Sequence, residues 1–110
     1  MAGQFSLDLL DSRPGLTTAR LVGELDLFTA PGLHERLSSL FDEGVRTLTL
    51  DLSGLEFIDS TGLAELVVAL KRHREGGGDV VLRCPRPSTA KVLEISGLDR
   101  VFVVTTDAAC

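Results

Sequence analysis

The sequence predicts a single α/β domain in which helices pack against a mixed β-sheet. Its length of 110 residues suits one compact domain and leaves no room for a second. Apolar residues make up 44% of the chain and charged residues 25%, a balance that can fill one hydrophobic core. Short apolar runs alternate with helical patterns in the order β-β-α-β-α-β-α-β, in which crossovers place helices against a sheet.

The first part of the chain predicts a β-hairpin followed by a helix. Residues 5–9 alternate apolar and polar side chains, and residues 16–25 continue as a second strand after the turn Arg13-Pro14-Gly15. Thr29-Ala30-Pro31 is a helix-opening signal, with Thr29 as the expected N-cap. Apolar residues then recur at the spacing of one helical face, and we expect the helix to end at Gly44 after Leu33, Leu37, Leu40 and Phe41.

The middle of the chain predicts a strand, a loop and a second helix. Residues 46–52 alternate leucines with polar side chains, and we expect residues 54–58 to form a loop. From Ser60 the apolar spacing is helical again, and the glycines at 76–78 should stop this helix. Its apolar face consists of Leu63, Leu66, Val67 and Leu70.

The last part of the chain predicts a strand, a short helix and a final strand. Residues 80–82 form a short apolar run, and residues 101–104 form another. Between them we expect Ser88 to cap a helix that carries Val92 and Ile95.

Charge and hydropathy exclude several classes of partner. With 16 acidic against 11 basic side chains the formal net charge is −5, so the basic surface that nucleic acid requires is missing. Trp and Tyr are absent, which disfavours stacking on bases or sugars. No apolar run approaches the roughly 20 residues that span a bilayer, and the N-terminus lacks a signal-peptide core. We therefore expect no direct binding of nucleic acid, no membrane association and a cytoplasmic location.

The cysteines and histidines show no metal-ligand spacing. Cys84 lies in an apolar run and is expected to be a buried small side chain, whereas Cys110 ends the chain on a loose tail. A regulatory disulfide between them is conceivable but disfavoured, because reducing compartments oppose it. His34 and His73 are expected to be ordinary surface side chains.

The sequence also lacks the signals of an enzyme. Neither the Gly-x-Ser-x-Gly elbow nor the Gly-x-x-x-x-Gly-Lys-Ser/Thr phosphate loop is present, and the glycines at 76–78 follow a helix rather than a strand. Asp51 and Asp59 could in principle act as an acid–base pair, but nothing supplies a cleft or a nucleophile beside them. We predict that the protein is not an enzyme and needs no cofactor.

Ser60 admits two interpretations from its position alone. A serine directly before a helix is a preferred N-cap, which is a purely structural role. A helix N-terminus is also where a phosphate group is best tolerated, because unpaired N–H groups and the helix dipole favour negative charge. A phosphate there would add about −1.5 to −2 charges beside Asp59, so it could block a surface while leaving the fold intact.

Three segments of the chain form a specific combination: Val22-Gly23-Glu24-Leu25-Asp26 with Thr29-Ala30, the stretch Asp51-Leu52-Ser53-Gly54-Leu55-Glu56-Phe57-Ile58-Asp59-Ser60-Thr61-Gly62-Leu63, and Ile95-Ser96-Gly97-Leu98. The first two would each be weak alone, but at this separation they together resemble the STAS domain of bacterial anti-sigma factor antagonists. The resemblance covers nearly the whole chain, so we expect one such domain over residues 1–110.

The resemblance implies a partner switch in transcription regulation. In that family the unphosphorylated antagonist binds an anti-sigma factor that is also a serine kinase, and this binding frees a sigma factor. The kinase then phosphorylates a serine that matches Ser60, the complex dissociates, and a metal-dependent serine phosphatase resets the switch. ATP and Mg²⁺ belong to the kinase.

The resemblance also assigns roles to residues around the serine. Asp59 is expected to shape the loop and to help the kinase recognise it, and Glu24 and Asp26 are expected to lie close to Ser60. Thr61 is either a second phosphate acceptor or a residue of the first helical turn. Ala64 departs from a glycine that is common in the family. The partner-binding residues implied are Glu24, Asp26, Asp59, Thr61, Gly62 and Leu63.

Two other functions remain open at this stage. One is a STAS domain that binds partners without being phosphorylated, as a subunit of a lipid-transport or signalling complex. The other is a small-molecule or nucleotide-binding module built on Glu24, Asp26 and the glycines at 76–78, which lacks a basic group to hold phosphate. The sequence leaves open the oligomeric state and the identity of the sigma factor and kinase.

Overall fold

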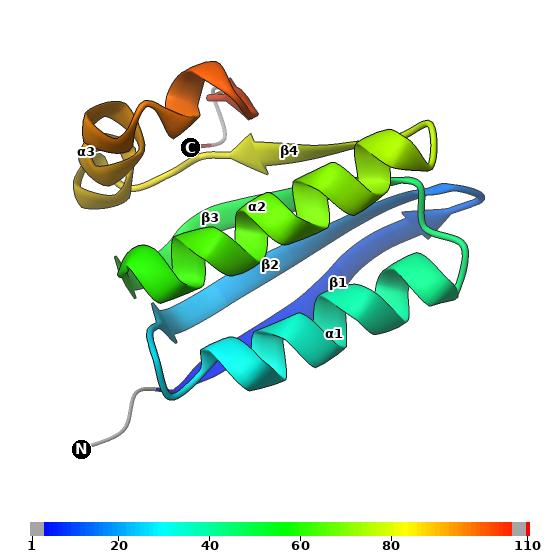
Figure 1. Ribbon diagram of the computed structural model, residues 1–110, viewed down its shortest axis with the longest axis horizontal. Coiled ribbons are helices and arrows are strands. Elements are labelled where there is room, and N and C mark those ends of the chain that lie inside the picture. The colour runs from blue at the N-terminus through cyan, green and yellow to red at the C-terminus, as the bar shows by residue number, and fades with distance from the viewer. Residues whose placement is uncertain (1–3, 107–109) are drawn as a thin grey trace.

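One five-stranded mixed sheet with helices beside it forms the fold in a computed structural model, which describes residues 4–106 and Cys110 (Figure 1). The predicted element order is confirmed, with one short 3₁₀ helix in addition. The elements are β1 (Phe5–Arg13), β2 (Leu16–Leu25), α1 (Ala30–Asp42), β3 (Thr47–Ile58), α2 (Ser60–Glu75), β4 (Asp79–Arg83), α3 (Pro87–Ser96), η1 (Leu98–Arg100) and β5 (Val103–Thr105).

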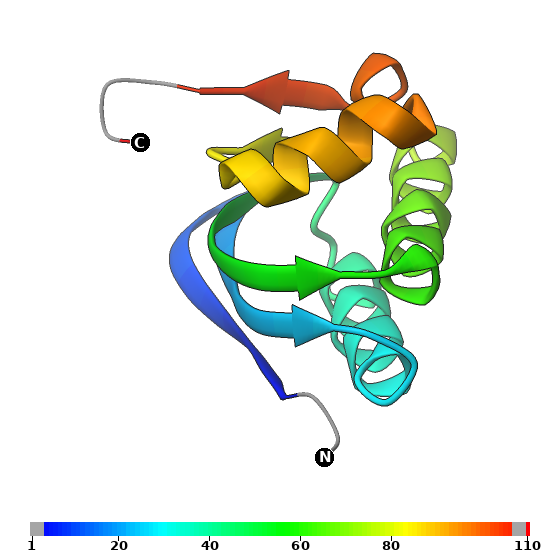
Figure 2. The same cartoon turned by 90° about the vertical axis from the view of Figure 1, so that its left-hand side faces the viewer.

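The strands lie in the order β1-β2-β3-β4-β5, with β1 antiparallel to β2 and the other neighbours parallel. The crossovers that join the parallel strands carry α1 and α2 onto one face of the sheet, whereas α3 lies apart from this pair, near β4 and β5 (Figure 2). All four parallel strands therefore end at the same edge, the one from which the chain enters α1 and α2.

The core lies between the sheet and the α1–α2 pair and consists largely of leucine. The alternating leucines of β3 point into it, and the predicted apolar faces of α1 and α2 cover them. Fully buried members include Leu21, Leu25, Leu33, Leu48, Leu50, Leu52, Leu66 and Leu70. Burial of a leucine contributes about 1.5 to 3 kcal/mol, so this layer holds the helices to the sheet.

The predicted loop at residues 54–58 is wrong, because β3 continues to Ile58. Parallel pairing with β2 extends the strand: Gly23 lies opposite Leu55, and Leu25 lies opposite Ile58. The register between the strands shifts twice along this stretch, which breaks the apolar alternation that would have marked a strand.

Two predicted boundaries near the C-terminus also differ. The third helix begins at Pro87 with Arg86 as its N-cap, so Ser88 lies inside the helix instead of capping it. Proline is favoured at the first helical position because its missing N–H would be unpaired there anyway. The last strand is limited to residues 103–105, since residues 98–100 form the 3₁₀ helix and Phe102 is buried in the core.

His73 is buried, which contradicts its expected place on the surface. Its side chain is 1% exposed and lies edge-on to Phe41, with ring centroids 5.1 Å apart. Nδ1 lies 2.7 Å from the carbonyl oxygen of Arg46, and because a carbonyl can only accept, Nδ1 carries the proton. His73 follows Leu70 by three positions and so falls on the same inner helical face. His34, by contrast, is exposed as predicted.

Cys84 and Cys110 form a disulfide, which corrects the expectation that they remain unpaired. Their Cα atoms lie 5.4 Å apart across a sequence separation of 26 residues. Cys84 is buried, as predicted. A crosslink over a loop of this length stabilises a fold by about 3 to 4 kcal/mol in the chain-entropy model. The predicted loose tail at residues 107–109 lies outside the described residues.

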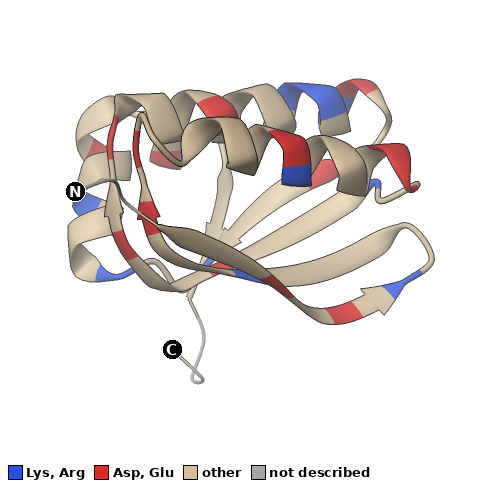
Figure 3. Ribbon diagram, turned by 90° about the horizontal axis from the view of Figure 1, so that it is seen from below, with Lys and Arg blue, Asp and Glu red and all other residues tan. Residues whose placement is uncertain are grey.

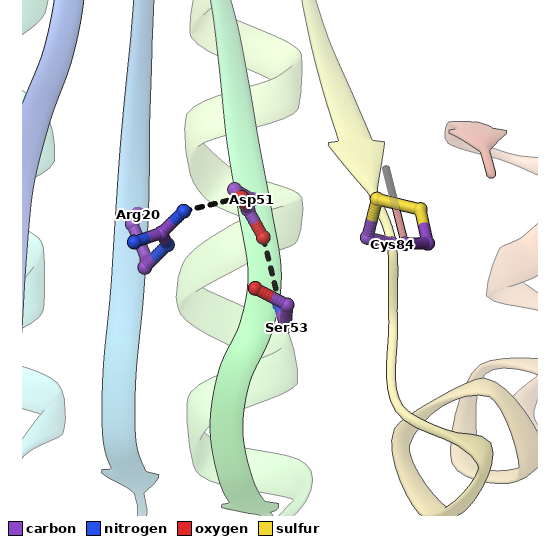
Figure 4. Close-up of a disulfide and its surroundings, with 5 residues drawn as sticks. Arg20, Asp51, Ser53 and Cys84 are labelled. Atoms are coloured by element: carbon purple, nitrogen blue, oxygen red, sulfur yellow. Dashed lines mark hydrogen bonds and ion pairs between the residues drawn. A yellow bond between two sulfur atoms is a disulfide. The ribbon is translucent and has the colours of Figure 1, made fainter. Parts of the chain in front are cut away.

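Asp51 is a buried carboxylate on the sheet face opposite α1 and α2. It is 4% exposed, lies 3.3 Å from the Arg20 guanidinium, and accepts a 2.8 Å hydrogen bond from the Ser53 backbone N–H (Figure 4). Burial alone would raise the pKa of Asp51. The hydrogen bonds from Ser53 and the bond and charge of Arg20 outweigh burial, so the pKa lies below its ordinary value of 3.8.

Gly62 lets the first turn of α2 pack directly on the end of β2. A Cβ atom at Gly62 would lie 2.7 Å from the Cβ of Leu25 and 2.8 Å from its carbonyl oxygen. Both contacts are too short for real carbon atoms, and one of them is to backbone that cannot rotate away. The closeness of α2 to β2 therefore requires glycine at this position.

We predict that Gly62→Ala destabilises the protein by about 1 to 3 kcal/mol, because the added methyl must displace the start of α2. Chemical denaturation monitored by circular dichroism measures this change. Ala64→Ser, on the exposed side of the same helix, should change stability by less than about 0.5 kcal/mol. Equal stability of the two variants would show that the contact with Leu25 is not tight.

Asp51→Asn should lower the free energy of unfolding by about 1 to 3 kcal/mol at neutral pH, since a charged hydrogen-bond acceptor is lost. A carboxylate with a depressed folded-state pKa stabilises above its unfolded pKa, and this contribution disappears as the pH falls through the folded value. The variant should therefore lose less stability than the wild type between pH 5 and pH 2. Denaturation curves across that range test this, with the exposed Asp8→Asn as control; parallel wild-type and Asp51→Asn curves would contradict the prediction.

Candidate functional site

The junction between β3 and α2 presents Ser60 to solvent. Asp59, not Ser60, is the N-cap of α2: its Oδ1 accepts hydrogen bonds from the backbone N–H groups of Thr61 at 2.9 Å and Gly62 at 3.1 Å. The expectation that Ser60 caps the helix is therefore wrong. Ser60 is the first residue of α2, is exposed, and its hydroxyl has no hydrogen-bond partner among the described residues.

The aspartate takes the capping role because of its backbone. Asp59 is extended, with φ −110° and ψ −175°, which is the conformation of an N-cap, whereas Ser60 already has helical geometry. A carboxylate also suits the positive end of the helix dipole better than a hydroxyl does. The serine hydroxyl is thus left without a capping role.

The loop that precedes α1 lies directly beside this junction. The Asp59 backbone N–H donates to the Leu25 carbonyl oxygen at 3.0 Å, and Glu24 lies opposite Phe57 in the parallel register. Glu24 and Asp26 flank Leu25, so the structure brings this acidic loop to the same sheet edge as Ser60.

The two acidic residues of that loop differ in what they bind. Asp26 Oδ1 accepts from the backbone N–H groups of Phe28 and Thr29, both at 2.9 Å, and so holds the turn into α1. The Thr29 hydroxyl donates to the Glu24 carbonyl oxygen at 2.9 Å and closes the same turn. Among the described residues, the carboxylate of Glu24 has no bonded partner.

Three large apolar side chains near the carboxyl ends of β2 and β3 are exposed. Leu27 is 65% exposed, Phe28 67% and Phe57 51%. We call these three residues the apolar rim. Side chains of this size are enriched at protein interfaces, and a cluster at one edge is more informative than scattered ones. Sequence reasoning missed the rim; the available signal was a pair of apolar residues, Leu27 and Phe28, between the predicted second strand and the first helix.

An open groove runs between the first turns of α1 and α2, next to Ser60. Its lining includes Leu27, Pro31 and Thr61. His34 and Glu65 also line it, with His34 Nδ1 2.7 Å from Glu65 Oε2. Thr61 thus lies in the first helical turn and lines the groove, and its chain neighbour Ser60 is exposed.

Gly62 and Leu63 are placed differently from the other residues predicted to bind a partner. Both are buried, Gly62 against Leu25 and Leu63 at 9% exposure in the core. They position α2 and can affect a partner only through the backbone they hold.

The basic residues of α2 lie at its C-terminal end, away from Ser60 (Figure 3). Acidic residues lie at both ends of the helical layer: where the strands enter α1 and α2, and also at the helix C-termini, where Asp42, Glu43 and Glu75 stand. Between residues 4 and 106, and at Cys110, no group of three or more His, Cys, Asp or Glu could hold a metal ion. No helix within the same part of the chain is long and apolar enough to cross a membrane.

Comparison with known proteins gives a consistent picture. The model of the STAS domain matches residues 9–109. BtrV of Bordetella bronchiseptica is 34% identical over 95 residues, covering 86% of this chain and 82% of that protein. The anti-sigma-B factor antagonist of Staphylococcus aureus is 32% identical over 76 residues, covering 69% of this chain and 70% of that protein.

Solved structures show the same fold. The phosphorylated form of the Bacillus cell fate determinant SpoIIAA superposes with a TM-score of 0.71 at 25% identity, covering 93% of each chain. The unphosphorylated form of the anti-sigma factor antagonist SpoIIAA has a TM-score of 0.78 at 24% identity, covering 93% of this chain and 90% of that one. The chain therefore belongs to the family of STAS-domain anti-sigma factor antagonists.

Proposed function

We propose that this protein binds an anti-sigma factor serine kinase while Ser60 is unphosphorylated, and that phosphorylation of Ser60 breaks the complex. The observation that supports this function best is the exposed Ser60 hydroxyl, which Asp59 relieves of the capping role. Binding would free a sigma factor for transcription, and the protein would act in the cytoplasm as a regulator rather than as an enzyme.

The comparisons supply the context for this proposal. SpoIIAA, which shares the fold, occurs in an unphosphorylated and a phosphorylated form. The Staphylococcus aureus relative is an antagonist of an anti-sigma factor. The corresponding partner of this chain would be an anti-sigma factor with kinase activity, and a serine phosphatase would reverse the modification.

The surface around Ser60 suits such a partner. The apolar rim offers three side chains that a partner could bury, and large apolar residues at the centre of an interface contribute most of its affinity. Glu24 and Asp59 would add charge that selects a basic complement. The other predicted residues would contribute by holding the turn into α1 and the start of α2 in position relative to each other. They are Asp26, Thr61, Gly62 and Leu63.

The chemistry would be carried out on this chain, not by it. The Ser60 hydroxyl oxygen would attack the γ-phosphorus of ATP held by the kinase, forming an O–P bond as the bond to ADP breaks. The hydroxyl proton would pass to a base of the kinase. ATP and Mg²⁺ would therefore belong to the partner.

Phosphorylation would weaken the complex without unfolding the domain. The phosphate would carry about −1.5 to −2 charges into the centre of the interface, close to the carboxylates of Glu24 and Asp59. Burying such a charge without a partner costs several kcal/mol, and each 1.4 kcal/mol corresponds to about tenfold in affinity.

We predict that Ser60→Asp and Ser60→Glu weaken binding to the cognate kinase by at least about tenfold, whereas Ser60→Ala retains it. Isothermal titration calorimetry with the purified kinase measures these affinities. All three variants should unfold at temperatures close to that of the wild type, because the Ser60 hydroxyl makes no hydrogen bond within the described residues. Equal affinity for all three variants would refute the switch.

Phe28→Ala and Phe57→Ala should each weaken the same complex by about tenfold or more while leaving the fold intact, since both side chains are mostly in solvent. Leu10→Ala provides the matched control, because Leu10 is 45% exposed on β1 and outside the apolar rim. If Leu10→Ala weakens binding as much as the rim variants do, the partner does not dock on the rim.

A separate measurement distinguishes this function from that of an unphosphorylated interaction subunit of a lipid-transport or signalling complex. Incubation with the kinase and ATP should add one phosphate by intact-mass spectrometry, and Ser60→Ala should abolish the addition. Phosphate that persists in Ser60→Ala and disappears in Thr61→Ala would move the acceptor to Thr61.

A further inference from the structure

The disulfide between Cys84 and Cys110 joins a buried residue to an exposed one. Cys84 directly follows β4 and is 6% exposed, whereas Cys110 is exposed to solvent. Figure 4 shows the disulfide of Cys84 beside the end of β4. Cys84 has a φ of 55°, a left-handed conformation that residues other than glycine rarely adopt. Its backbone N–H donates to the Thr105 carbonyl oxygen at 2.8 Å, so both the crosslink and this bond hold the chain in its turn.

The segment enclosed by the disulfide is otherwise attached lightly. It contains α3, η1 and β5, and β5 pairs with β4 over only three residues. The fully buried residues of α3 are Thr89 and Leu93, fewer than α1 and α2 contribute, and Phe102 adds one further anchor in the core. A crosslink over such a segment has a large effect on how firmly it is held.

The same segment borders the candidate site. Thr89 and Val92 of α3 line a depression together with Phe57 of the apolar rim and Ile58, the last residue of β3. The turn into α3 is tied to β3 as well, because Arg86 Nε donates to the Ser53 carbonyl oxygen at 2.7 Å. Because α3 and Phe57 line the same depression, a change in the order of α3 directly alters the surroundings of the apolar rim.

We propose that the Cys84–Cys110 pair is a reversible redox site that controls how firmly α3 and β5 are held against the sheet. The oxidised form fixes α3 beside Phe57, and the reduced form loosens it. The consequence for partner binding rests on the proposed function: the oxidised form binds the anti-sigma factor more tightly than the reduced form does.

The reaction is thiol–disulfide exchange with a small thiol or a dithiol protein. A thiolate attacks the sulfur of Cys110, the exposed residue of the pair, forming a mixed disulfide and releasing the Cys84 thiolate, which takes up a proton. A second thiol then attacks the mixed disulfide at the incoming sulfur. The protein gains two thiols, and the two reductant thiols leave as one disulfide, so electrons and protons balance.

The placement of Cys84 and Cys110 favours a reversible disulfide over a permanent crosslink. Exchange requires access to one sulfur, and Cys110 is the exposed residue of the two. In a protein that acts on transcription inside a cell, the surrounding thiols would keep the pair reduced until oxidising conditions arise, and disulfides of that kind are characteristically redox-sensing.

The first test uses the full chain equilibrated in glutathione buffers of graded redox ratio, with free thiols counted by alkylation and mass spectrometry. We expect the reduced and oxidised forms to interchange within the range that cells maintain, and the unfolding temperature of the reduced form to lie lower by about 10 °C. A pair that stays oxidised in the most reducing buffer, or two forms with equal unfolding temperatures, would overturn the proposal.

Amide hydrogen exchange locates the effect. Reduction should speed exchange in α3 and β5 while leaving α1, α2 and β2 unchanged, and Cys110→Ser should behave as the reduced wild type in every buffer. Uniformly faster exchange across the whole chain would mean general destabilisation instead of a local release, and would overturn the proposal.

Binding measurements with the anti-sigma factor distinguish a failure of this inference from a failure of the proposed function. Reduction should weaken binding of the wild type to the anti-sigma factor by about fivefold, and it should not change binding of Cys110→Ser. Absence of binding in every form would refute the proposed function but not the redox site, which the thiol and exchange measurements decide. Equal binding by oxidised and reduced wild type would refute the coupling to the rim.

Discussion

Parallel pairing of β2 with β3 is the constraint on which the rest of this structure depends. The register sets Leu25 opposite Ile58, and it lets the Asp59 N–H bond the Leu25 carbonyl oxygen. Gly62 then packs against Leu25, which fixes where α2 starts. Because the carboxyl ends of parallel strands meet at one edge, two loops from distant parts of the sequence become neighbours there. A shift of one residue in this register would separate the loop that carries Glu24 and Asp26, the apolar rim and Ser60 from one another.

The carboxylates at this edge of the sheet differ in whether they bond the backbone of their own chain. Asp59 satisfies the first N–H groups of α2, and Asp26 satisfies those of the turn into α1. Both are committed to the backbone, so their substitution would disturb the loops before it altered any surface charge. Glu24 is the exception, since its carboxylate has no bonded partner in the part of the chain that the structure describes. An effect of Glu24 on partner affinity would therefore report recognition more directly than an effect of either aspartate.

Patterns among neighbouring residues predicted most of the helices and strands. The wrong predictions arose where contacts between residues distant in the sequence decide the structure. The apolar spacing of α1 and α2 and the alternating leucines of β3 are properties of neighbouring residues, so the sequence displays them. The extension of β3 to Ile58 depends on pairing with β2, and the burial of His73 depends on the carbonyl of Arg46. The disulfide needs two residues that are 26 positions apart to meet. At the site, the motif located Ser60, but only the backbone angles of Asp59 revealed which residue caps the helix.

The separation of the cap from Ser60 would explain how the proposed phosphorylation could switch a surface without endangering the fold. If Ser60 were the cap, a phosphate on its hydroxyl would break the bonds that start α2, and part of the energy of modification would go into unfolding the helix. With Asp59 as the cap, those bonds stay in place whatever Ser60 carries. The cost of the added charge then falls on a complex in which that charge is buried. A rigid domain with an unengaged hydroxyl at the edge of an apolar rim is thus suited to a change of partner that needs no change of shape.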